Sequence, residues 1–283
     1  MSTLTRISPR IIVLPASHET DRPLLAAIQG AGNTVLMDAG NSPTHARKFL
    51  RLLAAEHIRP DGLVLTHHHW DHTFGLGAFD IPVVAHVNTR RHLEEMQTWS
   101  WTNDALAERV EQRRQTAFTA SNIQKEWGDN RNVTLRLPTV MYTHELTLDL
   151  GGGTTCVLIH PAVDHADDCT LLYVPEERTI FLGDAFYADT MTWTYSLAGA
   201  AALVKALEGL EIDRGFLSHE DEPWDRAVFH AWLRVLKEVI QTIPEIADTQ
   251  EPLEVAVTRR LGRALNEEES EIVGYFTKGL RTT

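Results

Sequence analysis

Thr66-His67-His68-His69-Trp70-Asp71-His72 is the stretch from which the fold and the chemistry of this chain can be worked out. It follows Gly62-Leu63-Val64-Leu65, a short apolar run that begins at the turn sequence Pro60-Asp61-Gly62. The run predicts a buried strand, and the stretch after it predicts a loop. Imidazole and carboxylate groups are costly to bury without partners, so their concentration beside a buried strand indicates a metal site.

The spacing within this stretch separates its potential ligands. Side chains of an extended segment alternate between two faces, so His67 and His69 point the same way and can chelate one metal ion, whereas His68 points away. Asp71 and His72 lie beyond the strand, where a turning backbone can aim both at a neighbouring position. These two residues suit a second metal ion.

Further ligand-type residues follow predicted strands later in the chain. They are His165 after residues 154–160, Asp184 after residues 179–182 and His219 after residues 214–217. A carboxylate can bridge two metal ions that lie about 3.5–4 Å apart, the separation found in two-metal hydrolytic sites. Asp184 is the available bridge.

The rest of the chain has the pattern of a layered α/β protein. Further strands are predicted at residues 10–14, 24–28, 34–37, 62–65, 81–85, 133–137, 146–150 and 171–174. Ser42 and Pro43 predict the cap and first residue of one helix, and Asn88 predicts the cap of another. Residues 89–130 read as a helical insertion, 197–207 as a helix, and about 224–280 as C-terminal helices with Asn266 as a cap.

Composition and charge restrict the class of protein. The 283 residues carry 39 acidic and 26 basic side chains, and the net charge of −13 repels phosphodiester backbones and argues against a nucleic-acid partner. No apolar run suits a membrane span or a signal-peptide core, and Cys156 and Cys169 suit a reducing compartment as free thiols. We expect a cytoplasmic protein that acts on a small molecule; a homodimer is left open.

The ligand-type residues resemble those of a known family. The pattern His67-x-His69-x-Asp71-His72, followed by His165, Asp184 and His219, resembles the metallo-β-lactamase superfamily, and Asp38-Ala39-Gly40 resembles its Asp-x-Gly. The resemblance covers about residues 10–220. It implies an α/β fold, a four-layer αββα sandwich with the metals at one edge between two sheets. We expect one domain over residues 1–283, with the helical insertion and the helical C-terminus added to this core.

Carried over position by position, the resemblance implies two sets of metal ligands. The first ion would be held by His67, His69 and His165, and the second by Asp71, His72 and His219. Asp184 would bridge the two ions. The imidazole-rich set favours Zn²⁺, with iron and manganese as alternatives because carboxylate oxygens also take part.

The expected function is that of a metal-dependent hydrolase. A hydroxide held by two divalent ions, with its pKa lowered from about 15.7 to about 7, would attack an ester, lactone, thioester or related bond of a small molecule. Asp71 is the expected catalytic residue, which would orient the hydroxide and shuttle its proton. The alternative is an iron-dependent oxidoreductase, because the resembled superfamily includes persulfide dioxygenases with a single iron.

Aromatic residues near the ligands are candidates for a substrate pocket. Members of the resembled family shape their pockets at the positions of Trp70, Phe74, Tyr187 and Trp193, and we expect one or two of these to contact substrate. The insertion contains three further tryptophans, which are either packing residues or the wall of a substrate lid. These are Trp99, Trp101 and Trp127.

The loop after His165 departs from the resembled pattern. Many hydrolytic members continue with Thr or Ser and small residues, whereas this chain continues with Ala166-Asp167-Asp168-Cys169. We interpret the two carboxylates as solvated rather than as acceptors for a ligand histidine. Cys169 is interpreted as a small packed hydrophobe.

Strand alternation makes a testable prediction about the histidine run. We expect His68→Ala to leave metal content and activity nearly intact, because its side chain points away from the site, and His69→Ala to abolish both. Metal analysis of the two purified variants measures this difference. Loss of metal from the His68 variant would show that the register assigned to the run is wrong.

Overall fold

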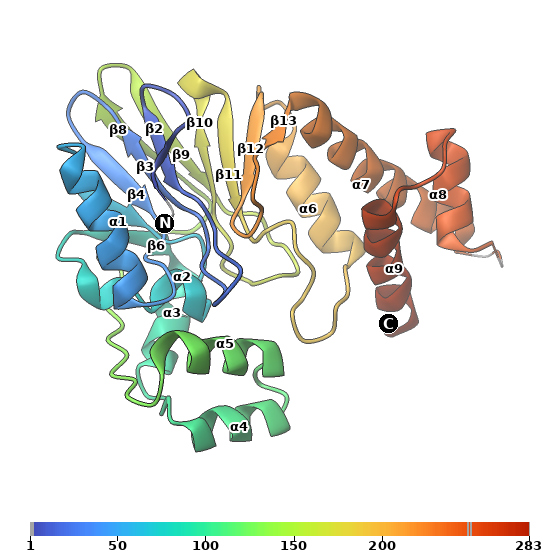
Figure 1. The fold of residues 1–283 in the computed structure, drawn as a ribbon. Helices are drawn as coiled ribbons and strands as arrows, with labels where there is room; N and C mark the ends of the chain where they lie inside the picture. Colours follow the sequence, from blue (N-terminus) through green and yellow to red (C-terminus); the bar gives the residue numbers. More distant parts are fainter. Residues whose placement is uncertain (1–2, 248, 250, 283) are drawn as a thin grey trace.

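The computed structural model describes residues 3–247, 249 and 251–282, and its strands form two sheets that face one another (Figure 1). The seven strands of the first sheet follow chain order: β1 (Thr5–Arg6), β2 (Ile11–Leu14), β3 (Leu25–Gln29), β4 (Thr34–Met37), β5 (Gly62–Val64), β6 (Val83–His86) and β7 (Val140–Tyr142). The second sheet has the order β13-β12-β11-β10-β9-β8, with β8 (Glu145–Gly151), β9 (Thr154–Ile159), β10 (Leu171–Val174), β11 (Thr179–Gly183), β12 (Arg214–Leu217) and β13 (Trp224–Asp225).

Strand direction decides which loops come together. The first sheet opens as an antiparallel meander from β1 to β4 and continues with parallel pairs from β4 to β7. In the second sheet β11 and β12 are parallel, so the residues that follow them leave the sheet at the same edge. Backbone hydrogen bonds join the two sheets at that edge, from Thr170 N to Thr66 O and from Leu24 N to Ser218 O, each 2.7 Å.

Alternating side chains along the strands build three apolar layers of packing. Ile11 and Val13 of β2 belong to the cluster between the sheets, whereas Ile12 and Leu14 face the helices outside the first sheet. A third cluster packs the outer face of the second sheet against the C-terminal helices. Both faces of each sheet are therefore covered. The chain is an αββα sandwich, as predicted.

The first helix begins as its sequence predicts. Ser42 caps α1 (Pro43–Ala55), because its hydroxyl accepts a hydrogen bond from His45 N at 3.1 Å, and Pro43 is the first helical residue. Asn266 likewise caps α9 (Glu267–Thr282): its side chain accepts from Glu269 N at 2.8 Å while the Glu269 carboxylate accepts from Asn266 N at 3.0 Å. This reciprocal pair is a capping box.

Two local predictions are wrong. The cap of α3 (Val87–Met96) is His86, whose Nδ1 accepts from Asn88 N at 3.3 Å, because the helix begins directly after β6. Residues 133–137 are not a strand, since β7 takes the position beside β6. Leu135 is nevertheless buried, and Gln97 donates to its carbonyl oxygen at 2.8 Å. Burial rather than sheet pairing accounts for the apolar pattern there.

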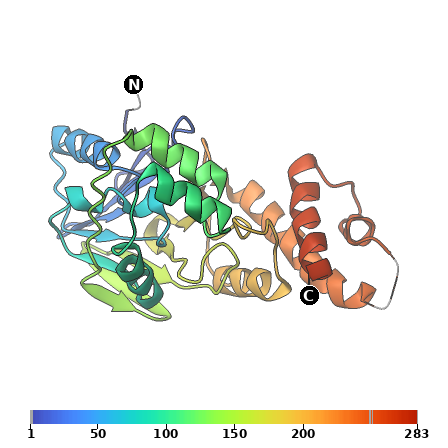
Figure 2. The same cartoon turned by 90° about the horizontal axis from the view of Figure 1, so that it is seen from below.

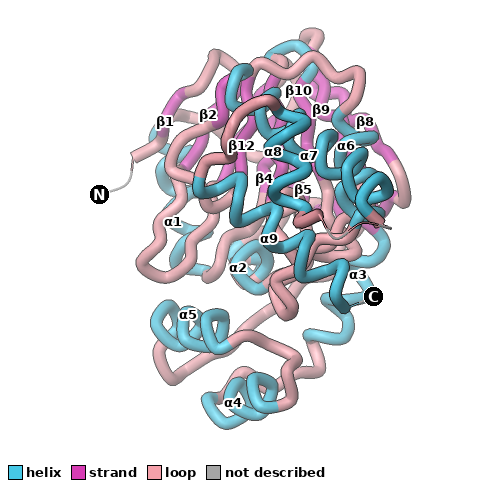
Figure 3. The backbone as a smooth tube through the Cα atoms, turned by 90° about the vertical axis from the view of Figure 1, so that its right-hand side faces the viewer, coloured by secondary structure: helices cyan, strands magenta, loops and turns pink. Residues whose placement is uncertain are grey.

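The insertion consists of α3, α4 (Asn103–Glu111) and α5 (Ala117–Trp127). α4 and α5 lie side by side beyond the sheet edge at which the short helix α2 (Trp70–Thr73) lies (Figures 1 and 3). The pair is tied to the sandwich by Glu126, whose side chain is only 2% exposed and accepts hydrogen bonds from Thr20, Arg22 and Ser42. Trp127 adds a hydrogen bond from its indole to Asn41 O at 2.8 Å.

The remaining helices cover the second sheet. They are α6 (Leu197–Leu207), α7 (Arg226–Ile246), α8 (Leu253–Leu261) and α9. Seen from below in Figure 2, α7, α8 and α9 lie together at one end of the molecule. Among the described residues, no helix has the length and apolar character that crossing a membrane requires.

Glu126 should be the main anchor of the insertion. Replacing it with alanine leaves the guanidinium of Arg22 without its carboxylate partner, and we expect the free energy of unfolding to fall by about 2–3 kcal/mol. Chemical denaturation measures the loss. Glu111→Ala, an exposed glutamate at the end of α4, is the matched control and should change stability little. Equal effects of the two substitutions would contradict the anchoring role.

Candidate metal centre

The predicted ligands meet at one edge between the two sheets. They come from the loop after β5 and from α2 (His67, His69, Asp71 and His72), from the loop between β9 and β10 (His165), and from the ends of β11 and β12 (Asp184 and His219). Ser218 N donates to Gly183 O at 3.1 Å, which holds the ends of β11 and β12 together. Residues far apart in sequence therefore reach one site because their strands end side by side.

His67, His69 and His165 form one group, in which one ring nitrogen of each lies within 4.8 Å of the others. His165 Nε2 lies 3.1 Å from His69 Nδ1. Two nitrogens bound tetrahedrally to one Zn²⁺ at about 2.0–2.1 Å lie roughly 3.3 Å apart, so this spacing suits a shared ion. The group matches the first ligand set that the resemblance implied.

Asp71, His72, Asp184 and His219 form the second group, also within 4.8 Å of one another. Asp71 Oδ2 lies 3.0 Å from His72 Nε2 and 3.1 Å from His219 Nε2. One carboxylate and two imidazole nitrogens thus converge on a common position. This is the second ligand set.

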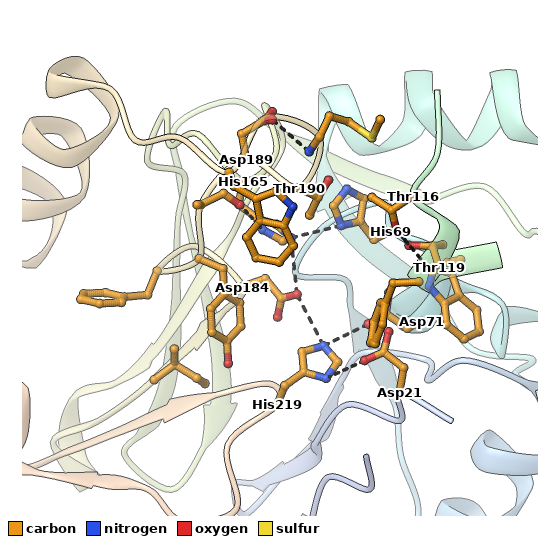
Figure 4. A pocket seen from close by; sticks show the side chains of 18 of the residues that line it. Asp21, His69, Asp71, Thr116, Thr119, His165, Asp184, Asp189, Thr190 and His219 are labelled. Carbon is orange, nitrogen blue, oxygen red and sulfur yellow. Dashed lines mark hydrogen bonds and ion pairs between the residues drawn. The ribbon is translucent and has the colours of Figure 1, made fainter. Parts of the chain in front are cut away.

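Asp184 lies between the two groups. Its Oδ2 is 3.4 Å from His165 Nε2 and 3.9 Å from His67 Nε2 in the first group, and 3.5 Å from Nε2 of both His72 and His219 in the second. A single carboxylate is therefore shared by imidazoles of both groups, the position that a bridging ligand requires. Figure 4 shows Asp184 between His165 and His219.

Buried partners orient the ligand rings. His72 Nδ1 donates to Asp38 Oδ2 at 2.8 Å, and the same carboxylate accepts from the backbone N and hydroxyl of Thr66. His165 Nδ1 donates to Ala188 O at 3.2 Å. Each bond leaves Nε2 of that ring as the free ligand atom. Asp38, the first residue of Asp-x-Gly, takes a positive φ of 61° to make these contacts.

The residues fit a metal on the evidence of their unpaired atoms. His67 Nε2, His72 Nε2 and Asp184 Oδ1 are buried and have no hydrogen-bond partner. Buried polar atoms without partners are costly, and here they point into the two ligand groups. Divalent ions bound by these groups would satisfy them.

Burial and charge divide the histidines into two types. Burial lowers the pKa of His67 and His69 well below its usual range, so both are neutral, the form that binds metals. Burial opposes the charging of His72 and His219 as well, but the carboxylates of Asp71 and Asp184 outweigh it and raise the pKa of both rings well above its usual range. The second group therefore holds excess negative charge, which a divalent cation can neutralise by displacing protons.

His68 faces away from the ligands, as strand alternation predicts. Its Nδ1 lies 2.9 Å from Asp168 Oδ1, and its ring stacks on His92 with centroids 3.9 Å apart. Asp168 is fully buried, so the interpretation of this carboxylate as solvated is wrong. It pairs with His68 rather than with a ligand histidine. Asp167 is half-exposed and contacts Arg91 and His92.

A cavity of about 810 Å³ opens on the ligand groups. Trp70, Tyr187 and Trp193 line it, as do Trp99 and Trp101 of the insertion. Figure 4 shows Thr116 and Thr119 of α5 and Asp189 and Thr190 of the loop after β11 around the same cavity. This volume lies in the range of small-molecule sites, about 300–1,000 Å³.

Two aromatic candidates have structural positions instead. Phe74 is fully buried, and its ring packs edge-on against Trp70, Trp101 and Trp127. The prediction that it belongs to the substrate pocket is wrong, because α2 turns its side chain into the core. Trp127 also packs there. Phe74 supports two residues that do line the cavity, Trp70 and Trp101.

Asp21 is a site residue that sequence reasoning missed. Its Oδ1 lies 3.4 Å from His219 Nδ1, and it lines the cavity. Burial and the neighbouring Asp71 raise the pKa of Asp21 to about 7. The residue follows no motif and is far from His219 in sequence, so only the pairing of strands could reveal it. Cys169, in contrast, is buried and free, as predicted.

Comparison with known proteins agrees with this arrangement. The family model described as "Metallo-beta-lactamase superfamily" matches residues 26–219. No curated protein matches the sequence significantly. Among solved structures, a metallo-beta-lactamase from Pontibacter korlensis is 17% identical with a TM-score of 0.58, and the match covers 84% of this chain and 99% of that one.

Two other solved structures match almost the whole chain. A metallo-beta-lactamase family protein from Thermus thermophilus is 18% identical with a TM-score of 0.56, over 98% of this chain and 95% of that one. A stereoselective inverting sec-alkylsulfatase from Pseudomonas sp. is 16% identical with a TM-score of 0.65, over 96% of this chain but only 47% of the sulfatase. At these identities the likeness shows a shared fold.

The position of Asp184 predicts an asymmetric response to mutation. Asp184→Ala should lower occupancy of both metal positions, because its carboxylate faces both groups, whereas His219→Ala should mainly weaken the second. Metal analysis of protein purified with excess metal should find close to two ions in the parent. His230→Ala, an exposed histidine on α7, is the control. Equal losses from Asp184→Ala and His219→Ala would contradict the bridging assignment.

Proposed function

The chain belongs to the metallo-beta-lactamase superfamily, and from this we propose that it is a metal-dependent hydrolase that cleaves an ester, lactone, thioester or related bond of a small molecule. Solved structures of similar fold include proteins described as a metallo-beta-lactamase and as an alkylsulfatase, both hydrolytic enzymes. The family also contains other activities, so the site itself must carry the proposal.

The observation that carries the proposal is the shared carboxylate. Asp184 Oδ2 lies within 3.9 Å of imidazole nitrogens from both ligand groups, and both groups face one cavity. When bound, two divalent ions supply an acidified water and a polarised substrate oxygen, which suits hydrolysis at a carbonyl or similar centre. His67, His69 and His165 would hold one ion, and Asp71, His72 and His219 the other.

Asp71 is the residue proposed to handle the proton. Its carboxylate lines the cavity and lies 3.1 Å from His219 Nε2. Burial alone would raise its pKa, but His72 and His219 lower it, so Asp71 is ionised and can accept a hydrogen bond from a nucleophilic water. Its second oxygen remains available to receive the proton during reaction.

Tyr187 is the proposed donor to the substrate oxygen. Its ring lies 6.2 Å from the rings of both His165 and His219, on the cavity wall. Burial and the charge of Asp184 raise the pKa of Tyr187 well above its usual range, so the phenol keeps its proton. A protonated phenol at this position can donate a hydrogen bond to an oxygen that gains charge.

The alternative, an iron-dependent oxidoreductase, has less support. A single iron would leave one ligand group unused, whereas both groups here are complete and share Asp184. Zn²⁺ is the proposed ion because imidazoles make up the whole of the first group and half of the second. Two buried free cysteines support a reducing compartment, and we propose the cytoplasm and a small-molecule substrate, with no nucleic-acid or membrane partner.

A substrate panel tests the proposal. Metal-loaded protein should hydrolyse at least one class among chromogenic esters, lactones, thioesters, phosphodiesters and sulfate esters, and a chelator should abolish this activity until metal is restored. Tyr187→Phe should lower kcat by about 10²-fold without changing metal content. Oxygen consumption with a persulfide, in protein that holds one iron and hydrolyses nothing in the panel, would favour the alternative instead.

A further inference from the structure

The cavity extends well beyond the ligand groups, and its walls come from parts of the chain far apart in sequence. The insertion contributes Trp99 and Phe118, and the loop between β11 and α6 contributes Trp193 and Tyr195. α9 adds Tyr275. α9 lies outside residues 26–219, so this wall is formed by a segment that the family model does not include.

Trp193 is held in a conformation that packing does not explain. Its side chain is 52% exposed, and its φ of 54° is rare for a bulky residue. Asp189 holds the turn: its carboxylate accepts from Met191 N and Thr192 N, and its carbonyl oxygen accepts from Trp193 N at 2.9 Å. Strain of this kind persists where the surroundings impose it, and it is common in ligand-binding segments.

Tyr275 completes an aromatic surface with this turn. The rings of Trp193 and Tyr275 lie 6.0 Å apart, and Tyr195 N donates to Tyr275 O at 3.4 Å. Tyr195 in turn stacks on the buried Phe276 at 5.0 Å. The surface is therefore supported from the core of the C-terminal helices while its exposed side faces the cavity.

The charges around the cavity disfavour an anion. Arg114 is the one Lys or Arg among the described residues that line it, and this guanidinium is already 3.2 Å from Glu95 and lies over the ring of Trp99. Glu268 and Glu271 of α9 line the cavity beside Tyr275. A negatively charged group placed there would meet carboxylates and no free cation.

We propose that the substrate carries a long apolar acyl or alkyl group without an anionic end, and that Trp193 and Tyr275 bind this group. The inference rests on the proposed hydrolase function for the reacting bond, which the metal ligands would hold. It adds the substrate class. An apolar chain would be buried against the aromatic surface while its functional group lies at Asp184.

Carboxylates of increasing length test the inference without requiring turnover. Acetate, hexanoate, decanoate and decanedioate are titrated into metal-loaded protein by calorimetry. Their carboxylate resembles a hydrolysis product, and decanoate and decanedioate differ at the distal end alone. We expect affinity to rise about threefold to fourfold for each methylene that becomes buried. Decanedioate should bind about tenfold or more weakly than decanoate, because its second carboxylate would lose solvent without gaining a partner.

Variants locate the apolar group. Trp193→Ala should weaken decanoate binding about tenfold and leave acetate binding unchanged, while Trp193→Phe should retain most of the affinity. Val255→Ala removes an equally exposed apolar side chain of α8 outside the cavity, and it should change neither. Metal content should be the same in all variants, since neither position is a ligand.

The outcomes separate this inference from the hydrolase proposal. Length dependence and rejection of decanedioate in a protein that hydrolyses no ester would support the apolar site and contradict the hydrolase. Equal affinity for acetate and decanoate, or for decanoate and decanedioate, would overturn the inference. An effect of Trp193→Ala no larger than that of Val255→Ala would overturn the role of Trp193.

Discussion

The shared carboxylate of Asp184 is the constraint on which the arrangement of this site depends. A buried aspartate surrounded by four imidazole nitrogens at 3.4–3.9 Å is stable only where strands from both sheets end at the same edge. Parallel pairing of β11 with β12 places His219 beside Asp184, and the loop after β5 places the histidine run opposite them. The αββα sandwich thus serves to bring these strand ends together.

Charge then determines what the edge can bind. The second group combines two carboxylates with two imidazoles whose pKa they raise, whereas burial keeps His67 and His69 neutral. Asp38 and Ala188 orient ligand rings from behind, so the free nitrogens point inward. Two cations at adjacent positions would satisfy the unpaired atoms on both sides of Asp184. This chemistry supports hydrolysis, and the cavity beside it supports recognition of an apolar group.

Sequence reasoning was accurate where a residue type has few physical explanations. Ser42, Pro43 and Asn266 were identified as helix boundaries because capping depends on local hydrogen bonds. His68 was separated from its neighbours by strand alternation alone. Errors arose where burial has several causes. Leu135 is buried without sheet pairing, Phe74 is buried in the core rather than in the pocket, and Asp168 is buried because His68 pairs with it.

The sequence by itself determined the metal-ligand types, their order and the strands that carry them, because histidines and carboxylates after buried strands have little other use. Only the tertiary structure decided which of these side chains share a site, since strand pairing places Asp184 between His165 and His219. It also decided the role of Asp21 and of Tyr275. These residues act through contacts between distant segments, and such contacts depend on how helices and sheets pack rather than on any local pattern.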